Sequence, residues 1–412
     1  MKIYEVGGAV RDALLGDAVD EHDWVVVGAR PAELEQLGFR RVGKDFPVFI
    51  HPDTGEEYAL ARRERKIAPG HSGFEFDTTA SVTLEEDLGR RDLTINAIAR
   101  DADGTLIDPH GGLDDLRGRV LRHISDAFRE DPLRVLRVAR FAAKLAPREF
   151  TVAAQTLELM RRMVEGGELE TLVPERVWQE TQKALETTRP DVYFATLRDC
   201  GALARVFPEI EKLFGVPQPE RWHPEIDTGV HTLLALRCAA QLTASTAARF
   251  AVLTHDFGKA ETPRALWPRH SGHGERSARI IERFCKRLPV PRKFETLAVH
   301  VARHHGVVHR ASELKPGTML ELLTAVDALR RPERLEEFLL ACEADARGRT
   351  GLEDRPYPQG DLVRLAQTAA LGVSAATVRD GALAGPALGA AIRQARIAAI
   401  GRALAGQAQR PP

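Results

Sequence analysis

Short runs of apolar and β-branched residues alternate with turns over the first part of the chain, and helical periodicity dominates the rest. The short runs are bounded by Gly, Pro and Asp, and they read KIYEV, DWVVVG, FPVFI and EYALA. Such runs between turn residues predict β-strands. Later stretches carry apolar residues every three or four positions, which predicts helices, as in VAAQTLELMRRMVE, PERVWQETQKALE and DVYFATLRDCGALARVF. The pattern therefore predicts an α+β head followed by all-α domains.

The chain is too long for one hydrophobic core, since it has 412 residues and single cores rarely grow beyond about 250–300. Nine of its fourteen histidines crowd into one stretch after the first helical patterns, which indicates a separate domain there. We expect four parts in chain order: a head at 1–110, a helical neck and body at 111–225, a histidine-rich domain at 226–330 and a helical tail at 331–412. The last residues, QAQRPP, should fray.

The composition is that of an ordinary soluble globular protein, with 43% hydrophobic and 28% charged residues. Because the net charge is −1, any nucleic-acid partner has to be held by a local basic face. The four cysteines contain no CxxC pair, which argues against a zinc ribbon and a disulfide framework. We find no signal peptide and no apolar stretch of membrane-spanning length, so we expect a cytoplasmic protein without membrane contact.

The first candidate site begins where the strand KIYEV runs into Gly7 and Gly8, which are followed by a helix that ends near Gly16. Glycines let backbone N–H groups approach phosphate oxygens closely, and a helix N-terminus adds a favourable dipole. Arg11 can add a forked contact. The stretch lacks the GK[ST] ending of a P-loop. We expect Gly8 and Arg11 to bind nucleotide, although a Gly-Gly pair alone would also fit a plain turn.

Acidic residues follow this turn at Asp20, Glu21 and Asp23, directly before the apolar strand WVVVG. In an extended chain Glu21 and Asp23 point to one side and Asp20 to the other. Two converging carboxylates repel each other unless cations lie between them, and two Mg²⁺ ions ~3.5–4 Å apart suit in-line nucleotidyl transfer. We therefore expect Glu21 and Asp23 to be catalytic Mg²⁺ ligands. Glu57 in EYALA is a candidate third acid, and the sequence leaves its role open.

A further motif reads DLGRRDLTINA from Asp87 onward. The order of glycine pair, helix, acid-x-acid and strand resembles the nucleotidyltransferase superfamily, which includes DNA polymerase beta and the tRNA CCA-adding enzymes. The further motif is similar to DLxRRDxTxNA of bacterial CCA-adding enzymes and poly(A) polymerases. This resemblance implies that Arg91 contacts the nucleotide and that Asp92 braces Arg91. From the residues alone, Asp92 would cap a helix over LTINAIA, and both roles can hold.

The segment EDPLR at residues 130–134 opens a helix with proline in its first turn. It is similar to the EDxxR motif of the same family, which implies that Asp131 and Arg134 present hydrogen-bonding edges to the incoming base and select C and A. We expect Arg137 and Arg140 to bind nucleotide as well. In isolation, the motif would be a helix cap with surface charge. Basic residues spaced three or four apart form one cationic stripe, namely Arg134, Arg137, Arg140, Lys144 and Arg148.

The second candidate site lies in the histidine-rich stretch, where an apolar run ends at His255-Asp256 and His231 lies upstream. This arrangement resembles the HD phosphohydrolase superfamily, whose residues hold divalent metal with open positions for water. The resemblance implies a metal site of His231, His255, Asp256 and, as the closing acid, Asp327. We expect most other histidines to be structural, and His305 lacks the aspartate that can follow it in relatives. These other candidates are His270, His273, His300, His304 and His305.

The resemblance to bacterial multifunctional CCA proteins with an HD domain spans residues 1–360. It implies template-independent addition of C, C and A to the 3′ end of tRNA from CTP and ATP, with the tRNA acceptor arm held by the helical body. It also implies 2′,3′-cyclic phosphodiesterase, 2′-nucleotidase and phosphatase activity with Ni²⁺ or another transition metal in the HD domain. The protein would be a monomer or homodimer.

Three alternatives remain open on the sequence. A bacterial poly(A) polymerase shares the head motifs but extends RNA with A alone. Glu21 stands where relatives have aspartate, which is compatible with an inactive, nucleotide-sensing head on a working HD phosphohydrolase. The third alternative is a tRNA-binding factor without catalysis.

Overall fold

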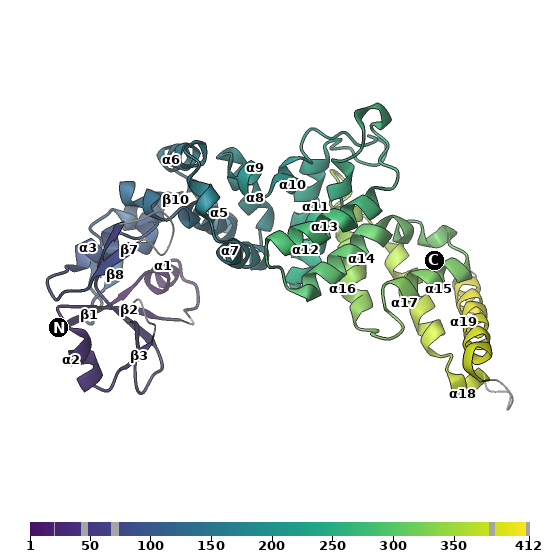
Figure 1. Ribbon diagram of the computed structural model, residues 1–412, viewed down its shortest axis with the longest axis horizontal. Coiled ribbons are helices and arrows are strands. Elements are labelled where there is room, and N and C mark those ends of the chain that lie inside the picture. The colour runs from purple at the N-terminus through teal and green to yellow at the C-terminus, as the bar shows by residue number, and fades with distance from the viewer. Residues whose placement is uncertain (20, 43–47, 67–73, 379–383, 409–412) are drawn as a thin grey trace. The chain divides into compact units, whose positions relative to one another are not determined.

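Two compact units make up the chain. The computed structural model describes residues 1–19, 21–42, 48–66, 74–378 and 384–408. The first unit comprises Met1–Thr181 and Val192–Val206, and the second comprises Gln182–Asp191 and Phe207–Pro412. The strands lie in the first unit, and the described part of the second is helical (Figure 1). The α+β class predicted from the sequence is confirmed.

A seven-stranded sheet forms the centre of the first unit, in the order β3-β4-β5-β2-β1-β8-β9. Neighbouring strands run antiparallel except β2 and β5, which run parallel. The strands predicted in KIYEV, DWVVVG and EYALA are present, and FPVFI is described only over β4. The bounds are β1 (Lys2–Val6), β2 (Asp23–Val27), β3 (Arg40–Val42), β4 (Val48–Ile50), β5 (Glu57–Leu60), β8 (Ala99–Arg100) and β9 (Leu106–Ile107), with β6 (Arg63–Lys66) and β7 (Phe74–Asp77) paired separately.

Both faces of this sheet are covered, which is why the central strand WVVV is apolar at successive positions. Val25 packs in one buried cluster with Leu88 of α3, and Val26 packs in another with Leu34 of α2. Because side chains alternate along a strand, Asp23 shares the face of Val25 that α3 covers. The helices of the head are α1 (Gly8–Leu14), α2 (Pro31–Gln36), α3 (Leu84–Gly89) and α4 (Gly112–Gly118).

The helix expected over LTINAIA does not form. Thr94–Asn96 is a single 3₁₀ turn, η1, and strand β8 follows it. The N–H of Thr94 donates to the carbonyl of Arg122, and the whole segment is buried. Asp92 accepts from the adjacent N–H of Leu93 and caps no helix. Tertiary pairing therefore overrides the local capping preference at this motif.

Helices joined by short breakers follow the head. The pattern PERVWQETQKALE forms α7 (Pro174–Glu186), and α5 (Leu133–Leu145) begins directly after Pro132. Gly201, with a φ of +78°, separates α8 from α9, so one long predicted pattern forms two helices. The other elements are β10 (Val120–Leu121), η2 (Asp126–Glu130), η3 (Ala146–Arg148), β11 (Thr151–Val152), α6 (Ala154–Glu165), η4 (Glu168–Thr171), α8 (Pro190–Asp199) and α9 (Ala202–Val206).

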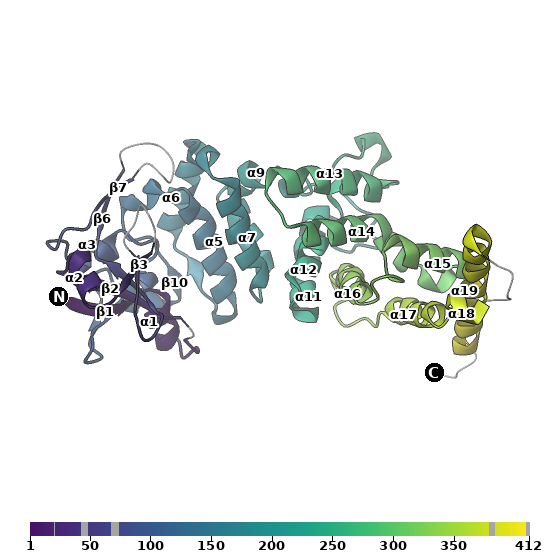
Figure 2. The same ribbon diagram turned by 60° about the horizontal axis from the view of Figure 1, so that its bottom comes forward.

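The second unit is built around α12, which is buried from its second residue to its last. It packs against α11, α14 and α16 (Figure 2), and so its apolar sequence carries the pair His255-Asp256 into the core. The elements are α10 (Pro208–Glu211), α11 (Thr228–Leu242), α12 (Thr246–Thr254), η5 (Phe257–Lys259), η6 (Arg264–Leu266), α13 (His273–Arg287), α14 (Arg292–Val308), η7 (Ala311–Glu313), α15 (Pro316–Ala325), α16 (Arg334–Arg347), α17 (Pro358–Leu371), α18 (Ala375–Val378) and α19 (Gly385–Ala408).

The C-terminal tail is more ordered than its composition suggests. Helix α19 continues through the first residues of QAQRPP, where we expected fraying, and residues 409–412 lie outside the described part. The Ala/Gly-rich sequence is therefore helical to Ala408. Within the described residues, no helix is both long and apolar enough to cross a membrane.

Gly258 should be required for packing in the second unit. A Cβ there would lie 2.2 Å from the carbonyl oxygen of His273 and 2.6 Å from the backbone nitrogen of Ser277. Gly258→Ala should cost about 1–3 kcal/mol by overpacking, which lowers the unfolding midpoint by roughly 2–12 °C for a unit of this size. Thermal unfolding followed by circular dichroism measures this shift.

Gly306→Ala is the matched control, because a Cβ at this helical position meets nothing within 4 Å. Alanine favours a helix over glycine by about 1 kcal/mol, so the midpoint of this variant should stay or rise. Equal midpoints for the Gly258 and Gly306 variants would contradict the close packing of η5 on α13.

Candidate functional site

Gly7 forms the turn between β1 and α1, with a φ of +75°. A Cβ at Gly7 would lie 2.8 Å from Nη1 of Arg91 and 3.6 Å from Oδ2 of Asp23. Only glycine allows both the left-handed backbone and this close approach. Gly8, which we expected to bind nucleotide, begins α1, and a Cβ there would meet only Arg11, at an ordinary 3.6 Å. The structure brings Gly7, Arg91 and Asp23 together. Gly7, and not Gly8, is the glycine that lies closest to the two side chains.

Carboxylates gather where β2 and β5 begin. Asp23 and Glu57 are the first residues of these parallel strands, and their Cα atoms are paired in register. Paired residues on neighbouring strands point to the same face, so both carboxylates lie on the face that α3 covers. Glu21, Asp23 and Glu57 are all exposed. Asp20, which we expected to face away from them, lies outside the described residues.

Arg91 is held by Asp87, whereas the sequence led us to expect Asp92. Nη2 of Arg91 lies 3.4 Å from Oδ2 of Asp87, whose Oδ1 lies 2.6 Å from Arg90. Burial would raise the pKa of Asp87, but Arg90 and Arg91 outweigh burial and lower this pKa. Nε of Arg91 is buried with no hydrogen-bond partner among the described residues. Nε of Arg91 is therefore a buried donor without a protein partner in the described chain, and Nη1 is the atom that lies nearest to Gly7.

Asp92 instead connects the head to α5. Its carboxylate accepts from Nε of Arg137 at 2.7 Å and from the side-chain amide of Asn96 at 2.9 Å, and Oδ1 of Asn96 accepts from Arg11 at 2.5 Å. Burial would raise the pKa of Asp92, but Arg137 and Asn96 outweigh burial and hold this pKa below its ordinary range. Arg11 is itself buried and pairs with Asp12 at 2.7 Å. The guanidinium of Arg11, which we expected to reach phosphate, therefore pairs with protein groups instead.

The basic stripe on α5 and the following turn is neutralised by acids from other elements. Helical spacing predicts which residues share a face, but it does not show which acids from distant parts of the chain cover that face. The stripe is therefore a seam of ion pairs within the first unit, and not the open basic face that we expected. The pairs are Arg137–Asp92, Arg140–Glu180 at 2.6 Å, Lys144–Asp12 at 2.9 Å and Arg148–Asp17.

Asp131 and Arg134 at the start of α5 are both held in place by protein groups. Arg176 of α7 donates to the two oxygens of Asp131, at 2.7 and 3.3 Å. Arg134 is buried and donates to the carbonyl of Ala127 at 2.8 Å and to that of Arg90 at 2.6 Å. Since Arg90 belongs to the DLGRRD motif, the two motifs that we linked to nucleotide binding are bonded to each other.

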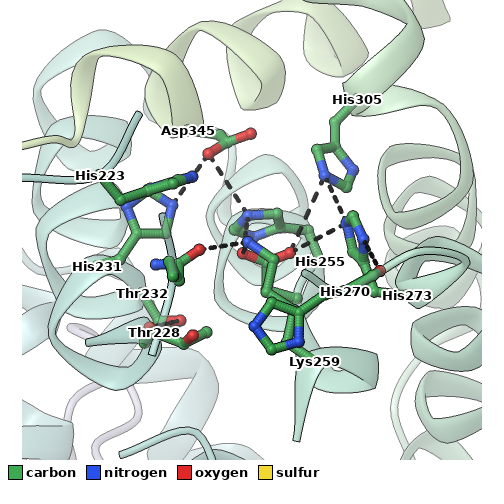
Figure 3. A network of polar contacts seen from close by, with 12 residues as sticks. His223, Thr228, His231, Thr232, His255, Lys259, His270, His273, His305 and Asp345 are labelled. Atoms are coloured by element: carbon green, nitrogen blue, oxygen red, sulfur yellow. Dashed lines mark hydrogen bonds and ion pairs between the residues drawn. The ribbon is translucent and has the colours of Figure 1, made fainter. Parts of the chain in front are cut away.

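The second site is a cluster of imidazoles and carboxylates in the core of the second unit (Figure 3). Nε2 of His231 lies 3.0 Å from Oδ1 of Asp345. Nε2 of His255 lies 3.1 Å from Oδ2 of Asp256 and 3.6 Å from Oδ1 of Asp345. All four residues are buried. The structure therefore brings together His231, His255 and Asp256, as the sequence led us to expect.

The structure does not bring Asp327 to this cluster, and Asp345 of α16 stands where the closing acid was expected. Asp327 follows α15 with a φ of +59° and faces Arg331 and Arg334, at 3.7 and 3.6 Å. The signal for Asp345 was present in the sequence, because an acid at a core position of a helix requires a partner. Asp345 continues, at helical spacing, the buried face formed by Leu335, Phe338 and Cys342.

His273 and His305, which we expected to be structural, also face the cluster. Nε2 of His273 lies 3.4 Å from Oδ1 of Asp256 and 3.2 Å from Nε2 of His305. His270, His300 and His304 belong to none of the ligand groups in the described chain. Those groups draw on His223, Glu225, His231, His255, Asp256, His273, His305 and Asp345.

Two carboxylates dominate the electrostatics of the cluster. Burial disfavours a charged His255, but Asp256 and Asp345 outweigh burial and raise the pKa of His255 to about 10. Against the effect of burial, His255 in turn holds the pKa of both carboxyl groups well below the ordinary range. Burial and the neighbouring His255 lower the pKa of His305 to about 3. The cluster therefore attracts positive charge while His305 stays neutral.

Further polar residues orient the cluster from outside. Oε1 of Glu225 lies 2.9 Å from Nδ1 of His231. Oδ2 of Asp345 lies 2.6 Å from Nε2 of His309, and Nδ1 of His309 lies 2.9 Å from the hydroxyl of Tyr357. Partners of this kind fix which ring nitrogen faces inward, and they gave no signal in the sequence.

Family models match three successive parts of the chain. A poly A polymerase head domain matches residues 3–122, a probable RNA and SrmB-binding site of polymerase A matches 149–214, and an HD domain matches 228–349. The residues around Gly7 fall within the first match, and the histidine cluster through Asp345 falls within the third.

Curated relatives match nearly the whole chain. A multifunctional CCA protein of Nitrosococcus oceani is 59% identical over 404 residues, which cover 98% of this chain and 99% of the relative. A multifunctional CCA protein of Methylococcus capsulatus is 58% identical over 413 residues, which cover 100% and 97%. The chain belongs to the multifunctional CCA protein family. It is a CCA-adding nucleotidyltransferase with an HD domain.

Solved structures of CCA-adding enzymes share the fold of this family member. The Thermotoga maritima CCA-adding enzyme complexed with tRNA(CCA) has a TM-score of 0.63 at 19% identity, over 98% of this chain and 91% of that chain. The Bacillus stearothermophilus CCA-adding enzyme in complex with CTP has a TM-score of 0.62 at 23% identity, over 97% and 89%. At these identities the likeness shows the fold alone.

Asp92→Asn should loosen the connection between the head and α5 in this multifunctional CCA protein. The variant replaces the carboxylate that accepts hydrogen bonds from Arg137 and Asn96 by a neutral amide. This change lowers the free energy of unfolding by about 1–3 kcal/mol. Hydrogen–deuterium exchange followed by mass spectrometry should therefore be faster over residues 133–145 at neutral pH. Asp114→Asn is the control, because Asp114 is exposed and should leave this exchange unchanged.

The effect of Asp92→Asn should depend on pH. Because the folded-state pKa of Asp92 lies below its ordinary value, its carboxylate contributes fully above about pH 4 and less as the pH falls through the folded-state pKa. The stability difference between wild type and variant should therefore shrink on acidification. A difference that grows toward low pH would contradict the role of the ionised carboxylate.

Proposed function

We propose that the chain adds C, C and A to the 3′ end of tRNA, without a template, from CTP and ATP. The observation that carries this proposal is the convergence of Gly7, Arg91, Asp23 and Glu57 in a chain 59% identical to a multifunctional CCA protein. Related structures are described as complexes with tRNA, with CTP and with ATP, which supports these partners.

The carboxylates at the ends of β2 and β5 fit Mg²⁺, which prefers oxygen ligands and retains several waters. Glu21, Asp23 and Glu57 offer such oxygens at an exposed edge. When bound, Mg²⁺ would activate the 3′-hydroxyl and neutralise the triphosphate and the leaving pyrophosphate. Glu21 precedes the first residue of β2, so its longer side chain is not fixed by strand pairing and can adjust to the metal.

Arg91 is the side chain best placed to hold the triphosphate, because Nη1 of its guanidinium lies beside Gly7, where a phosphate can approach the backbone closely. We expected Arg11, Arg137 and Arg140 to touch the nucleotide, but all three pair with carboxylates. In the proposed mechanism these three position α5 and α1 around the nucleotide, and Arg91 supplies the direct charge.

Asp131 and Arg134 read the base in this proposal. The contacts from Arg176 and to two backbone carbonyls fix both side chains before a base arrives. A carboxylate that accepts from an exocyclic amine and a guanidinium that donates to a ring acceptor suit C and A, whereas U and G carry a carbonyl at that edge. Groups fixed in advance lose little entropy on binding, so they can replace a template strand.

The segment at 149–214, which matches an RNA-binding model, would hold the acceptor arm by shape and phosphate charge. The acidic partners of the stripe on α5 make it a poor phosphate site. Exposed basic side chains of the segment, such as Arg161, Arg162 and Arg205, are better candidates for phosphate contacts.

The HD domain supports a second proposed activity, metal-dependent hydrolysis of phosphate esters, namely 2′,3′-cyclic phosphodiesterase, 2′-nucleotidase and phosphatase action. The cluster borders a cavity of about 730 Å³ that includes one acidic residue, Glu313, in its lining. The lining is mainly basic, and its positive charge favours an anionic substrate. The rings of Trp222 and Tyr357 in the lining suit a nucleobase. The basic residues of the lining are Lys259, Arg269, Arg310, Arg347, Arg349 and Arg355.

The residues of the cluster fit a transition metal such as Ni²⁺. Nε2 of His255 and both oxygens of Asp256 are buried and make no well-directed hydrogen bond in the described chain. Imidazole nitrogen together with carboxylate oxygen suits this class of ions, and when bound such an ion would polarise the phosphoryl group and lower the pKa of an attacking water. Lys259, which lies 2.6 Å from Asp256 and lines the cavity, would meet the substrate phosphate.

Because poly(A) polymerases share the head motifs and the matching head model is described as a poly A polymerase head, a run of A alone is the alternative product to test. Incubation with end-trimmed tRNA, Mg²⁺ and each nucleoside triphosphate in turn, followed by sequencing of the 3′ ends, separates the two. Ends that read CCA support the proposal, and runs of A support the alternative. No addition, together with hydrolysis by the HD domain, would support the nucleotide-sensing head.

The two activities should be separable by single substitutions, because their metals rest on different residues of different units. Asp23→Ala should abolish nucleotide addition and leave phosphoester hydrolysis intact. Asp256→Ala should do the reverse. Addition is measured with end-trimmed tRNA and CTP, and hydrolysis with 2′,3′-cyclic AMP. If either variant remained folded but lost both activities, the two-site proposal would fail.

Base choice should depend on Arg134. Arg134→Ala should raise misincorporation of UTP and GTP by about 5- to 150-fold relative to CTP, since one lost discriminating contact is worth about 1–3 kcal/mol. Arg129→Ala is the matched control, because Arg129 lies in the preceding turn and pairs at the surface with Glu168. Single-nucleotide incorporation kinetics measure the ratio. Unchanged selectivity would leave Arg134 a structural role only.

A further inference from the structure

A buried acid lies in the middle of the seven-stranded sheet, on the face opposite the one that α3 covers. Glu5 belongs to β1, which lies between β2 and β8, and its side chain is 8% exposed. It is paired in register with Trp24 on one side and with Arg100 on the other, so all three share a face. Trp24 packs against the buried cluster of Val26 and Leu34. A carboxylate in this position requires partners that donate to it.

Both oxygens of Glu5 have a partner, and one partner lies just before β2. Oε2 lies 3.3 Å from Nη1 of Arg100. Oε1 lies 2.5 Å from Nδ1 of His22. A carboxylate oxygen accepts hydrogen bonds, so Nδ1 of His22 carries the ring proton and donates it. This bond anchors His22 to the neighbouring strand, although the strand pairing of β2 begins one residue later, at Asp23.

The contact between His22 and Glu5 shows which way the chain faces just before β2. Side chains two residues apart on a strand share a face, and a diagonal neighbour on the next strand lies within reach of a long side chain. Glu5 is opposite Trp24, and His22 lies two residues before Trp24. The rings of His22 and Trp24 are stacked, with centroids 6.2 Å apart and planes inclined by 21°. His22 therefore continues the face of Trp24, and strand alternation extends to His22.

Rings on this face also connect β2 to β5. Trp24 is stacked on Tyr58, with centroids 5.5 Å apart and an angle of 13° between the ring planes. Tyr58 directly follows Glu57, just as Trp24 directly follows Asp23. The beginnings of both acidic strands are therefore held from behind, on the face that turns away from the carboxylates.

Glu21 is the carboxylate that needs this support. Asp23 is directed by strand pairing, because its Cα is in register with Val6 and Glu57. Glu21 lies outside that pairing. In a segment that alternates like a strand, however, the neighbour of an anchored His22 points to the opposite face, which is the face of Asp23. The anchor therefore directs Glu21 without touching it.

We infer that Glu5 and His22 form a positioning pair that aims the carboxylate of Glu21 at the metal position of the head. The pair faces away from that position and acts only through Glu21. This inference rests on the proposed role of Glu21 and Asp23 as Mg²⁺ ligands. Groups that hold metal ligands from behind typically contribute about 10- to 100-fold to metal affinity or activity, which sets the scale of the expected effect.

The effect of Mg²⁺ on nucleotide affinity tests the inference without turnover. The probe is α,β-methylene-CTP, which cannot release pyrophosphate, and isothermal titration calorimetry of the full chain gives its affinity with Mg²⁺ and with EDTA. The ratio of these affinities, the Mg²⁺ factor, reports on the metal ligands. His22→Ala should lower the Mg²⁺ factor about tenfold and leave the affinity in EDTA unchanged. An equal loss in both conditions would overturn the inference and leave His22 a structural role only.

His22→Asn should keep the Mg²⁺ factor, because its amide nitrogen is as many bonds from Cα as Nδ1 of histidine and can donate to Glu5. His51→Ala is the matched control. The ring of His51 also lies against Tyr58, with centroids 5.5 Å apart, but His51 follows β4, on the other side of β5 from β2. It should keep the full Mg²⁺ factor as well. A loss in either variant as large as that of His22→Ala would contradict the positioning pair.

His22→Ala leaves a buried carboxylate with one partner fewer, which can destabilise the sheet. Glu5→Leu and His22→Ala together remove both the acid and its anchor. This double variant should unfold near the wild-type temperature, as followed by circular dichroism, and should still show the lowered Mg²⁺ factor. A wild-type Mg²⁺ factor in the folded double variant would overturn the inference.

Substitution of the carboxylates separates this inference from the function on which it rests. If Asp23→Asn and Glu21→Gln both kept the wild-type Mg²⁺ factor, the proposed metal site would fail. If Asp23→Asn lost it while Glu21→Gln or His22→Ala kept it, only the positioning pair would fail. Adding His22→Ala to Glu21→Gln should cause no further loss, because the residue through which His22 acts is already replaced. A further loss would show that His22 acts by another route and would overturn the inference.

Discussion

A carboxylate that is buried away from water must be matched by positive charge or by hydrogen-bond donors, and both units are organised around this requirement. In the first unit Asp87 holds Arg90 and Arg91, while Asp92 holds Arg137. In the second unit, Asp256 and its neighbouring acid on α16 draw in imidazoles and one lysine. The first unit supplies that positive charge from its own arginines. In the second unit, side chains balance the negative charge of the buried carboxylates only in part. This remaining negative charge leaves room for cations.

Much of the first site could be predicted because its residues are near one another in sequence or follow from strand alternation. The order of glycine turn, acid and strand was readable in the sequence, whereas the parallel pairing that aligns Asp23 with Glu57 is seen only in the structure. The assignment of Asp92 as the brace for Arg91 did not hold, since neighbours in a motif need not be neighbours in space. Asp87, four residues before Arg91, reaches it within one helical turn.

The differences at the basic stripe come from partners that are far away in the chain. Periodicity placed the arginines of α5 on one face, but it carried no information about Asp12, Asp17 or Glu180, which reach that face from distant segments. The closing acid of the histidine cluster was missed for a different reason. Asp345 continues the apolar face of its helix, which was a readable signal that the prediction did not use. The packing of α16 against α11 and α12 then carries Asp345, and not Asp327, into the core.

The ligand types of the two units keep their metals apart. The head offers exposed carboxylates, a ligand type that suits hard ions. The HD cluster offers buried imidazole nitrogens whose orientation is fixed by backbone carbonyls, which favours softer ions and slower exchange. Because the two ligand sets differ, each would prefer a different class of ion. Ions at the exposed carboxylates would exchange readily with solvent and substrate, whereas the buried cluster would have to acquire its ions before a substrate fills the cavity.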